Sequence, residues 1–279
     1  MFHRFSKSIL FAPLLSLLLG GVLVVSCGDD ENEEDVQTSS SNQNGGTPAF
    51  DGEDKVYTVN GVSFKMIAVK GGTFQMGSDD GYEWEKPVHR VTLSDYYIGE
   101  TEVAQELWIA VMGSNPSYCT GNMQCPVEMV SWNDCQTFIS KLNQLTGETF
   151  RLPTEAQWEY AARGGNKSKG YTYSGSNVID DVAWYDDNSG EMTYPVKTKV
   201  PNELGIYDMS GNVWEWCSDW YGSYSSAAQT DPTGPATGSH RVMRGGSWGS
   251  YASSCRVASR NSFTPTGGNN FYLGLRLAY

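Results

Sequence analysis

The sequence predicts an α+β fold in which the helices come early and irregular β structure comes late. Three segments between residues 101 and 165 have the caps and apolar periodicity of helices. From residue 170 onward the chain is rich in turns and aromatic clusters and has few long periodic runs. The 31 glycines and 35 aromatic residues indicate a core of large rings joined by tight turns.

Successive strands are predicted for residues 56–77, VYTVNGVSFKMIAVKGGTFQMG. Apolar and polar residues alternate along this stretch, which is the period of a half-buried strand. Turns are expected at Asn60-Gly61 and at the glycine pair of residues 71 and 72.

Helices are predicted for residues 101–113, 131–147 and 154–165. Each segment begins at a threonine or serine that can cap the free amides of a first turn, and each ends at glycine. In the third, Thr154 and Gln157 form a capping box. With no internal repeat or linker-like break, residues 53–279 are expected to form one domain.

Residues 1–27 are interpreted as a lipoprotein signal peptide. A charged start precedes an apolar run that closes with VVSC, and the small residue before Cys27 resembles the lipobox of bacterial lipoproteins. Cleavage would leave Cys27 as the lipidated first residue. A membrane-spanning anchor is the weaker alternative, because a proline and a glycine pair interrupt an already short run.

An acidic, Ser/Gly/Asn-rich tether is expected for residues 28–52. It opens with GDDENEED, which holds six acidic residues in eight, and its low hydrophobicity is typical of disorder. An acidic run after the lipid-bearing cysteine resembles a surface-export signal, although a solvated spacer explains it equally well. From the lipobox we expect an anchor in the bacterial envelope, and from the acidic run we expect the outer membrane and the cell surface. The 19 basic against 32 acidic residues argue against a nucleic-acid partner.

Five cysteines follow Cys27. In an exported protein, Cys119 and Cys125 are the expected disulfide, being six residues apart. Cys135 falls on a predicted helix and Cys217 in an aromatic strand, so both are expected to be buried free thiols.

Four motifs resemble the formylglycine-generating-enzyme (sulfatase-modifying-factor) family in the family's order. They are PVEMVSWNDCQTFISKLNQLTGETFRLPTEAQWEYAARGG, LGIYDMSGNVWEWCSDWY, RVMRGGSW and LGLRL. The resemblance covers about residues 56–279. It implies a C-type-lectin-related fold with little regular secondary structure, stabilised by calcium.

The resemblance also implies a calcium site at Asp208, Gly211, Val213 and Glu215. In the family the matching residues hold the ion, the middle two through main-chain oxygen, and calcium prefers such hard oxygen ligands. Asp208 replaces the family's asparagine and remains an oxygen donor. The alternative is that these acids cap turns or pair with an arginine.

The family's oxidase chemistry uses two cysteines that bind copper(I) near a Gly-Gly-Ser-aromatic turn. Here Ser247 matches the active-site serine, Trp248 matches the aromatic residue, and the first copper-binding cysteine falls on Ser250. A hydroxyl is a poor copper(I) ligand and cannot form a disulfide. Cys255 has the spacing of the second cysteine, so only one thiol is present and copper is not expected. Ser247, Ser250 and Cys255 are vestigial or altered catalytic candidates.

Two other enzyme classes are disfavoured. A three-histidine iron site cannot be assembled from His89 and His240, the two histidines outside the signal peptide. A Ser247-His240-Asp219 hydrolase lacks anything like a nucleophile elbow.

The segment 249–272, GSYASSCRVASRNSFTPTGGNNFY, lacks Lys, Glu, Gln, Met and Trp. These five types make up 53 of the 279 residues, so four or five would be expected in 24 positions. The composition is reachable by changing adenines in AAC codons, and it resembles the variable proteins of diversity-generating retroelements. A surface loop of small turn residues is the simpler alternative.

This segment is predicted to bind an unknown protein or glycan, because rigid aromatic rings with Ser and Asn are the mix used by antibody paratopes. The predicted contact residues are Trp248, Ser250, Tyr251, Ser253, Ser254, Asn261, Phe263, Asn269, Asn270, Phe271 and Tyr272. Arg256, Arg260 and Arg276 are expected to brace the scaffold against acidic groups.

The sequence thus favours an exported lipoprotein whose domain displays a non-catalytic binding surface. A formylglycine-generating oxidase with an altered active site and a structural lipoprotein of a gliding or secretion machine are the alternatives. Neighbouring genes would discriminate among them.

Overall fold

The computed structural model describes residues 50–268 and 270–279, which lie within one compact unit, Asn44–Tyr279. The signal peptide, the lipidation site at Cys27, nearly all of the acidic tether and Asn269 fall outside the described residues. Within the described part, no helix is long and apolar enough to cross a membrane.

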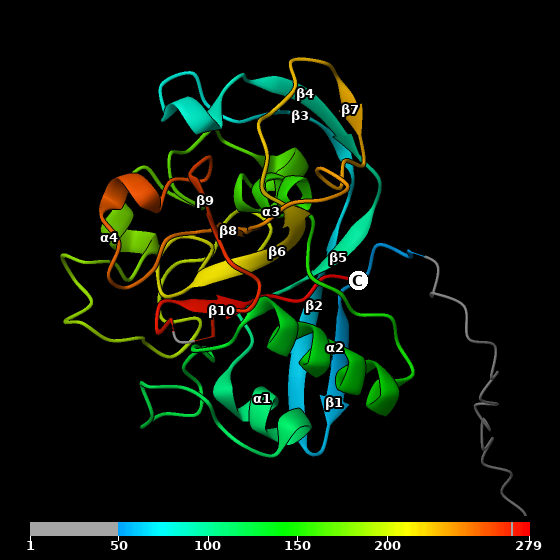
Figure 1. The fold of residues 1–279 in the computed structure, drawn as a ribbon, viewed down its shortest axis with the longest axis vertical. Coiled ribbons are helices and arrows are strands. Elements are labelled where there is room, and N and C mark those ends of the chain that lie inside the picture. The colour runs from blue at the N-terminus through cyan, green and yellow to red at the C-terminus, as the bar shows by residue number, and fades with distance from the viewer. Residues whose placement is uncertain (1–49, 269) are drawn as a thin grey trace, which may run out of the picture. The chain divides into compact units, whose positions relative to one another are not determined.

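Three small sheets form the framework (Figure 1). The first is antiparallel, in the order β1 (Lys55–Val59), β2 (Val62–Val69), β5 (Tyr96–Gly99). The second has the order β3 (Gly72–Met76), β4 (His89–Leu93), β7 (Gln229–Thr230). The third has the order β10 (Leu273–Leu275), β6 (Trp214–Trp220), β8 (Arg241–Arg244), β9 (Arg260–Phe263). The predicted strands of residues 56–77 and the Asn60-Gly61 turn are confirmed, with both turn residues at positive φ. The turn expected at Gly71 and Gly72 is not formed, because the chain passes there from the first sheet to the second without pairing β2 with β3.

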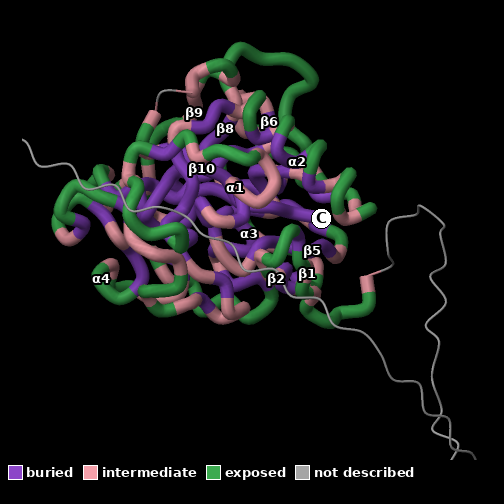
Figure 2. Tube along the Cα trace, turned by 90° about the horizontal axis from the view of Figure 1, so that it is seen from below, coloured by how far each residue is buried: buried purple, intermediate pink, exposed green. Residues whose placement is uncertain are grey.

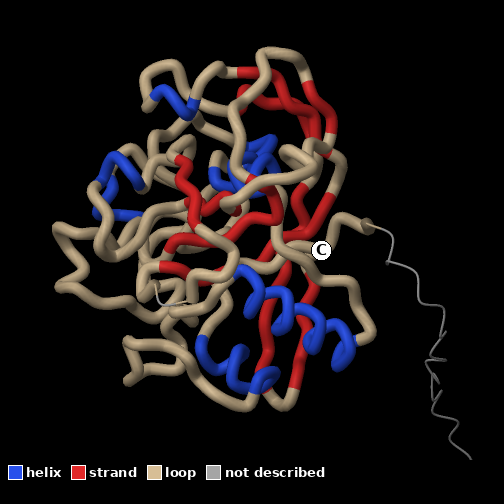
Figure 3. The backbone as a smooth tube through the Cα atoms, viewed as in Figure 1, coloured by secondary structure: helices blue, strands red, loops and turns tan. Residues whose placement is uncertain are grey.

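The helices are few, and most of the chain is loop (Figure 3). They are α1 (Gln105–Met112), α2 (Trp132–Thr146), α3 (Glu155–Ala162) and α4 (Ile179–Val182), with 3-10 turns η1 (Glu83–Glu85), η2 (Gly165–Lys167) and η3 (Ala252–Ser254). α1 and α2 lie beside β1 and β2 at one end of the domain (Figure 1). The long loops join the remaining elements, and this arrangement is the predicted α+β fold.

The helix ends follow the sequence with two exceptions, and one is the C-terminus of α3, which ends at Ala162 with Arg163 rather than a glycine at its C-cap. α2 begins after Ser131 and α3 after Thr154, and both have the reciprocal hydrogen bonds of a capping box. The predicted threonine cap of the first helix is wrong, because α1 begins at Gln105. The amides of its first turn donate instead to the carbonyls of Cys125 (2.9 Å) and Met123 (3.0 Å), so a neighbouring loop replaces the side-chain cap.

The buried residues form two large apolar clusters in the interior (Figure 2). Cys135 on α2 and Cys217 on β6 are both fully buried free thiols, as predicted. Desolvation raises the pKa of each thiol well above its usual range. These two cysteines therefore act as small apolar core residues.

Three arginines of the C-terminal third hold distant elements together, as the sequence predicts. Each donates to a buried glutamate from an earlier part of the chain, at N–O distances of 2.5 to 2.6 Å. The pairs are Arg256 with Glu85, Arg260 with Glu155 and Arg276 with Glu215. The segment between β8 and β10 is thus fixed to a rigid scaffold.

Candidate functional site

The segment 249–272 leaves the end of β8, passes through η3 and β9 and returns to β10. Its two arms are tied to neighbouring loops by the backbone. The amide of Asp186 donates to the carbonyl of Ser250 (3.1 Å), and the amide of Met129 donates to that of Asn270 (3.2 Å). Near α2, the amide of Asn133 donates to the carbonyl of Pro265 (3.3 Å). These contacts hold the segment against the scaffold at both ends.

Four rings form a continuous aromatic surface: Tyr118, Trp248, Phe271 and Tyr272. Centroid distances are 5.7 Å between Tyr118 and Phe271, 5.9 Å between Trp248 and Phe271, and 4.5 Å between Trp248 and Tyr272. Tyr118 is 70% exposed and Phe271 is 37% exposed, whereas Trp248 is buried. The indole N–H of Trp248 donates to the carbonyl of Phe271 (3.0 Å), so this tryptophan supports the surface from below.

Tyr118 was not among the residues predicted from the sequence. It lies in the loop between α1 and α2, and its neighbour Cys119 donates its amide to Oε1 of the buried Glu128 (2.7 Å). This carboxylate fixes the loop that presents Tyr118 to Phe271. Because the two rings are more than 150 residues apart in the chain, no local sequence pattern could have paired them.

A second exposed area lies around η3. Tyr251 is 74% exposed, and Ser253 accepts a hydrogen bond from the hydroxyl of Tyr82 (3.3 Å). Tyr82 stacks on Trp84 with the ring centroids 4.7 Å apart, and both rings are partly exposed. Tyr82 and Trp84 were also missed by sequence reasoning, and the pair of Arg256 with Glu85 keeps η1 beside this area.

The remaining predicted contact residues divide between surface and support. Asn261 on β9 is exposed, and Ser250 and Ser254 are half-buried. Phe263 is half-buried and packs against the core cluster, and Asn270 accepts the amide of Tyr272 (3.0 Å) with its side chain. These last two residues therefore shape the surface more than they extend it.

The catalytic candidates Ser247, Ser250 and Cys255 lie together, but their geometry does not give a reactive thiol. The Ser247 and Ser250 hydroxyl oxygens are 3.0 Å apart. Cys255 is fully buried, and desolvation raises the pKa of its thiol to about 12, so it is protonated at neutral pH. It packs under Gly246, where an added Cβ would come within 2.6 Å of its Sγ.

The calcium candidates fall in one buried cluster of carboxylates, but Glu215 is already paired. Its two oxygens accept hydrogen bonds from Nε of Arg276 (3.0 and 2.9 Å), and Oε1 also accepts from Nη2 (2.6 Å). Oε2 accepts in addition from the indole N–H of Trp158 (2.6 Å). The alternative that these acids pair with an arginine therefore describes Glu215.

The charges of Glu215 and Arg276 both act on the carboxyl of Asp208, which accepts a hydrogen bond from the backbone amide of Lys197 (2.9 Å). Burial raises its pKa to about 6. Glu102 joins the cluster from the loop after β5, and burial followed by the charge of Asp208 raises its pKa well above the usual range. Three carboxylates thus share one guanidinium.

The backbone amides of this turn are also engaged. Gly211 donates to the carbonyl of Gly245 (2.9 Å), and Val213 donates to Oε1 of Glu102 (3.0 Å). Among the described residues, no three His, Cys, Asp or Glu side chains are arranged to hold a metal ion. In this arrangement Arg276 is the cation beside Glu215. Calcium binding here stays a prediction that a titration can test.

The predicted disulfide between Cys119 and Cys125 is not formed in the structure, where both are free thiols. The Sγ of Cys125 instead lies 3.9 Å from the carbonyl oxygen of Thr193. Gln105 sits between the two cysteines, because its amide donates to the carbonyl of Cys125 and its side chain to that of Cys119 (both 2.9 Å).

Comparison with known proteins places this geometry in a family. Residues 59–279 match the family described as the sulfatase-modifying factor enzyme 1-like domain. Chaperone protein LppX of Paenibacillus barcinonensis is 36% identical over 256 residues, covering 74% of this chain and 86% of its own. The formylglycine-generating enzyme of Streptomyces coelicolor is 33% identical over 287 residues, covering 76% and 88%.

Two solved structures are similar along most of the chain. Treponema denticola variable protein 1 has a TM-score of 0.76 and 38% identity, covering 81% of this chain and 98% of its own. PvdO from Pseudomonas aeruginosa has a TM-score of 0.63 and 25% identity, covering 77% and 93%. From the family match and these relatives, the chain belongs to the sulfatase-modifying factor enzyme 1-like family and has its α+β, C-type-lectin-related fold.

Proposed function

We propose that this protein is a lipoprotein of the bacterial envelope that binds a protein ligand with the surface of segment 249–272. The observation that carries the proposal is the aromatic surface of Tyr118, Trp248, Phe271 and Tyr272, which is partly exposed and rigidly supported. Exposed rings on a fixed scaffold mark interaction sites, because they gain contact area with little loss of conformational entropy.

The surroundings of these rings suit adaptable recognition. Ser253, Asn261 and the exposed Tyr251 place hydroxyl and amide groups on the solvent side of the segment. The arginines of the segment are paired with buried glutamates, so substitutions at exposed positions leave the supporting ion pairs intact. Such a division between fixed support and exchangeable surface is what sequence diversification requires.

Diversification by a retroelement is part of the proposal. It is supported by the composition of residues 249–272 and by the similarity to Treponema denticola variable protein 1. A reverse-transcriptase gene and a template repeat beside this gene are expected, with adenine-directed substitutions confined to codons 249–272. Substitutions spread evenly over the domain would contradict this part.

The envelope location rests on the lipobox-like sequence before Cys27 and the acidic run after it. A relative of 36% identity carries the name LppX. Metabolic labelling with a fatty acid is expected to label the chain and to be lost in Cys27→Ser, and proteolysis of intact cells tests exposure on the outer membrane.

Photo-crosslinking in the native cells tests the binding surface. A benzoyl-phenylalanine placed at Tyr251 or Phe271 is expected to give one discrete adduct with a protein. The matched control is Leu145 on α2, which is 53% exposed and belongs to no part of the surface. Adducts that are the same at all three positions, or none at Tyr251 and Phe271, would refute the proposal.

An oxidase with an altered active site is the second candidate, and the 33% identity to a formylglycine-generating enzyme favours it. It requires Cys255 to act as a thiolate, which its burial and its pKa of about 12 oppose. Copper(I) titration beside Cys255→Ser, with a sulfatase-type cysteine peptide present, decides between the two. Copper binding and peptide oxidation that vanish in Cys255→Ser would establish the enzyme.

A further inference from the structure

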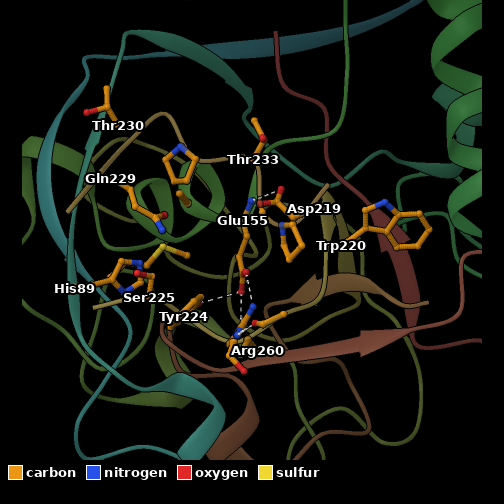
Figure 4. Close-up of a pocket in the computed structure, with 17 residues that line it drawn as sticks. His89, Glu155, Asp219, Trp220, Tyr224, Ser225, Gln229, Thr230, Thr233 and Arg260 are labelled. Carbon is orange, nitrogen blue, oxygen red and sulfur yellow. Dashed lines mark hydrogen bonds and ion pairs between the residues drawn. The ribbon is translucent and has the colours of Figure 1, made fainter. Parts of the chain in front are cut away.

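A cavity of about 490 Å³ lies apart from segment 249–272's aromatic surface, between the second sheet and the start of α3 (Figure 4). Its walls come from β4, the start of α3, the end of β6 and the loop 222–235 that carries β7. The volume is within the range of about 300–1,000 Å³ typical of small-molecule sites. Nothing in the proposed binding function uses this cavity.

One side of the cavity is an ion pair whose charges satisfy each other. Arg260 donates from Nε and Nη2 to the two oxygens of Glu155 (2.7 and 2.6 Å), and the Tyr224 hydroxyl donates to the same carboxylate (3.0 Å). The remaining nitrogen, Nη1, donates to the carbonyls of Gly222 (2.9 Å) and Trp84 (3.2 Å). An anionic ligand such as a phosphate would therefore find no free cation on this wall.

Asp219 presents one unpartnered oxygen to the cavity. Its Oδ2 accepts from the amide of Glu155 and from the hydroxyl of Ser218 (both 3.0 Å), which fixes the carboxyl group. Its Oδ1 accepts no hydrogen bond from the described residues, although Asp219 is only 4% exposed. Burial, followed by the charge of Glu155, raises the pKa of Asp219 to about 7, so near neutral pH it can both donate to and accept from a hydroxyl.

His89 supplies a second fixed polar atom. Its Nδ1 lies 3.0 Å from the carbonyl oxygen of Pro87, so Nδ1 carries the proton and Nε2 of the neutral ring is an acceptor. The ring is held against Tyr224 at a centroid distance of 4.7 Å, and His89 is 3% exposed. Nε2 has no partner among the described residues. His89 lines the cavity, so this nitrogen can accept a hydrogen bond from a ligand there.

The rest of the lining is neutral. The side chains of Gln229, Thr230 and Thr233 line the cavity without a hydrogen-bond partner in the described part of the chain, and Figure 4 shows them around the same space as Asp219. Apolar surface comes from prolines 232 and 235, Met76 and Trp220. The lining thus combines fixed acceptors, amide and hydroxyl groups with apolar faces. Its one arginine, Arg260, is already paired with Glu155.

We propose that this cavity binds a neutral saccharide, with Asp219 and His89 accepting hydrogen bonds from its hydroxyl groups. Gln229 and Thr230 bond further hydroxyls, and the apolar faces pack against the C–H groups of the sugar ring. A phosphorylated or amino sugar fits less well, because the phosphate meets no free cation and a partly protonated carboxyl pairs weakly with an ammonium group.

Nuclear magnetic resonance titration of residues 44–279, the compact unit, tests this site. The probes are the methyl glycosides of glucose, galactose and mannose, with glucose 6-phosphate and glucosamine as charged comparators. At least one neutral glycoside is expected to give saturable amide shifts in residues 219–235 with a Kd of about 1 mM. Asp219→Asn should weaken it about tenfold or more, through loss of a hydrogen bond to a charged group.

Thr230→Val, at an exposed position, is the second variant and should weaken binding about threefold or more while leaving the fold intact. The matched control is Val178→Ala, which is 56% exposed and lies outside both the cavity lining and the aromatic surface, and it should leave the Kd unchanged. Three results would overturn the proposal: no saturable shift with any neutral glycoside, tighter binding of glucose 6-phosphate, or wild-type affinity in both cavity variants. Since the crosslinking test uses other residues, the two proposals fail separately.

Discussion

Replacing Arg276 by methionine should strongly lower the free energy of unfolding of the domain. Arg276 is fully buried, and it donates to both oxygens of Glu215 and to the carbonyls of Gly99 (2.9 Å) and Tyr207 (2.8 Å). Methionine keeps the apolar stem and removes the charge. Glu215 is then left buried without its cation.

The expected size follows from the burial of both partners. Removing one member of a buried ion pair destabilises a protein by about 3–5 kcal/mol. Glu215→Gln should have a similar effect, since it leaves the guanidinium of Arg276 without its main partner. The double variant should lose less than the sum of the two, because neither charge remains, and the difference should be about 1–3 kcal/mol.

Urea unfolding of residues 44–279, followed by tryptophan fluorescence, measures all four members of the cycle. Arg90→Met on β4 is the matched control, because Arg90 is exposed and no ion pair holds it in the described part of the chain, so it should change stability by less than about 0.5 kcal/mol. Additive effects of the two cluster variants, within about 0.5 kcal/mol, would refute the reasoning.

Three other outcomes are expected. Asp219→Asn should flatten the pH dependence of the free energy of unfolding. In the wild type the raised pKa of the Asp219 carboxyl stabilises the fold at pH values below its ordinary pKa of 3.8, and this stabilisation is lost as pH rises through about 7. The loss is about 4 kcal/mol. Identical stability-against-pH curves for the two proteins would contradict this. Millimolar calcium should raise the thermal midpoint, and Asp208→Asn should abolish the rise; an unchanged midpoint in the wild type would contradict the calcium site expected from the sequence. In the native protein Cys255 should resist iodoacetamide while the half-buried Cys119 reacts, as read by mass spectrometry; alkylation of both at equal rates would show that Cys255 is accessible.

The parts of the fold that the sequence predicts well depend on local features. The capping boxes at Ser131 and Thr154 and the Asn60-Gly61 turn depend on residues within a few positions of one another, so their chemistry is visible in the sequence. The start of α1 is the counterexample. Its first amides are satisfied by the carbonyl of Cys125 and its neighbours, a partner supplied by a loop that no local rule includes.

The candidate site shows the same division. Phe271 and Tyr272 could be chosen from composition, because a segment of small polar residues and rings is unusual wherever it lies. Tyr118 could not, because only the packing of the α1–α2 loop brings its ring to 5.7 Å from Phe271. Trp248 was predicted as a contact residue, but it is buried, and its role as a support under Phe271 follows only from the fold.

The amino-acid pattern is enough to predict the family, the α+β class, the caps of α2 and α3 and the pairing of C-terminal arginines with acidic groups, since these follow from local chemistry and charge. Only the packed chain shows which glutamate each arginine meets, that Gln105 donates to the carbonyls of Cys119 and Cys125, and that Asp219 and His89 line one cavity. Such contacts join residues tens of positions apart, and their distances depend on how long loops pack. That packing is a property of the whole folded chain, which no short stretch of sequence encodes.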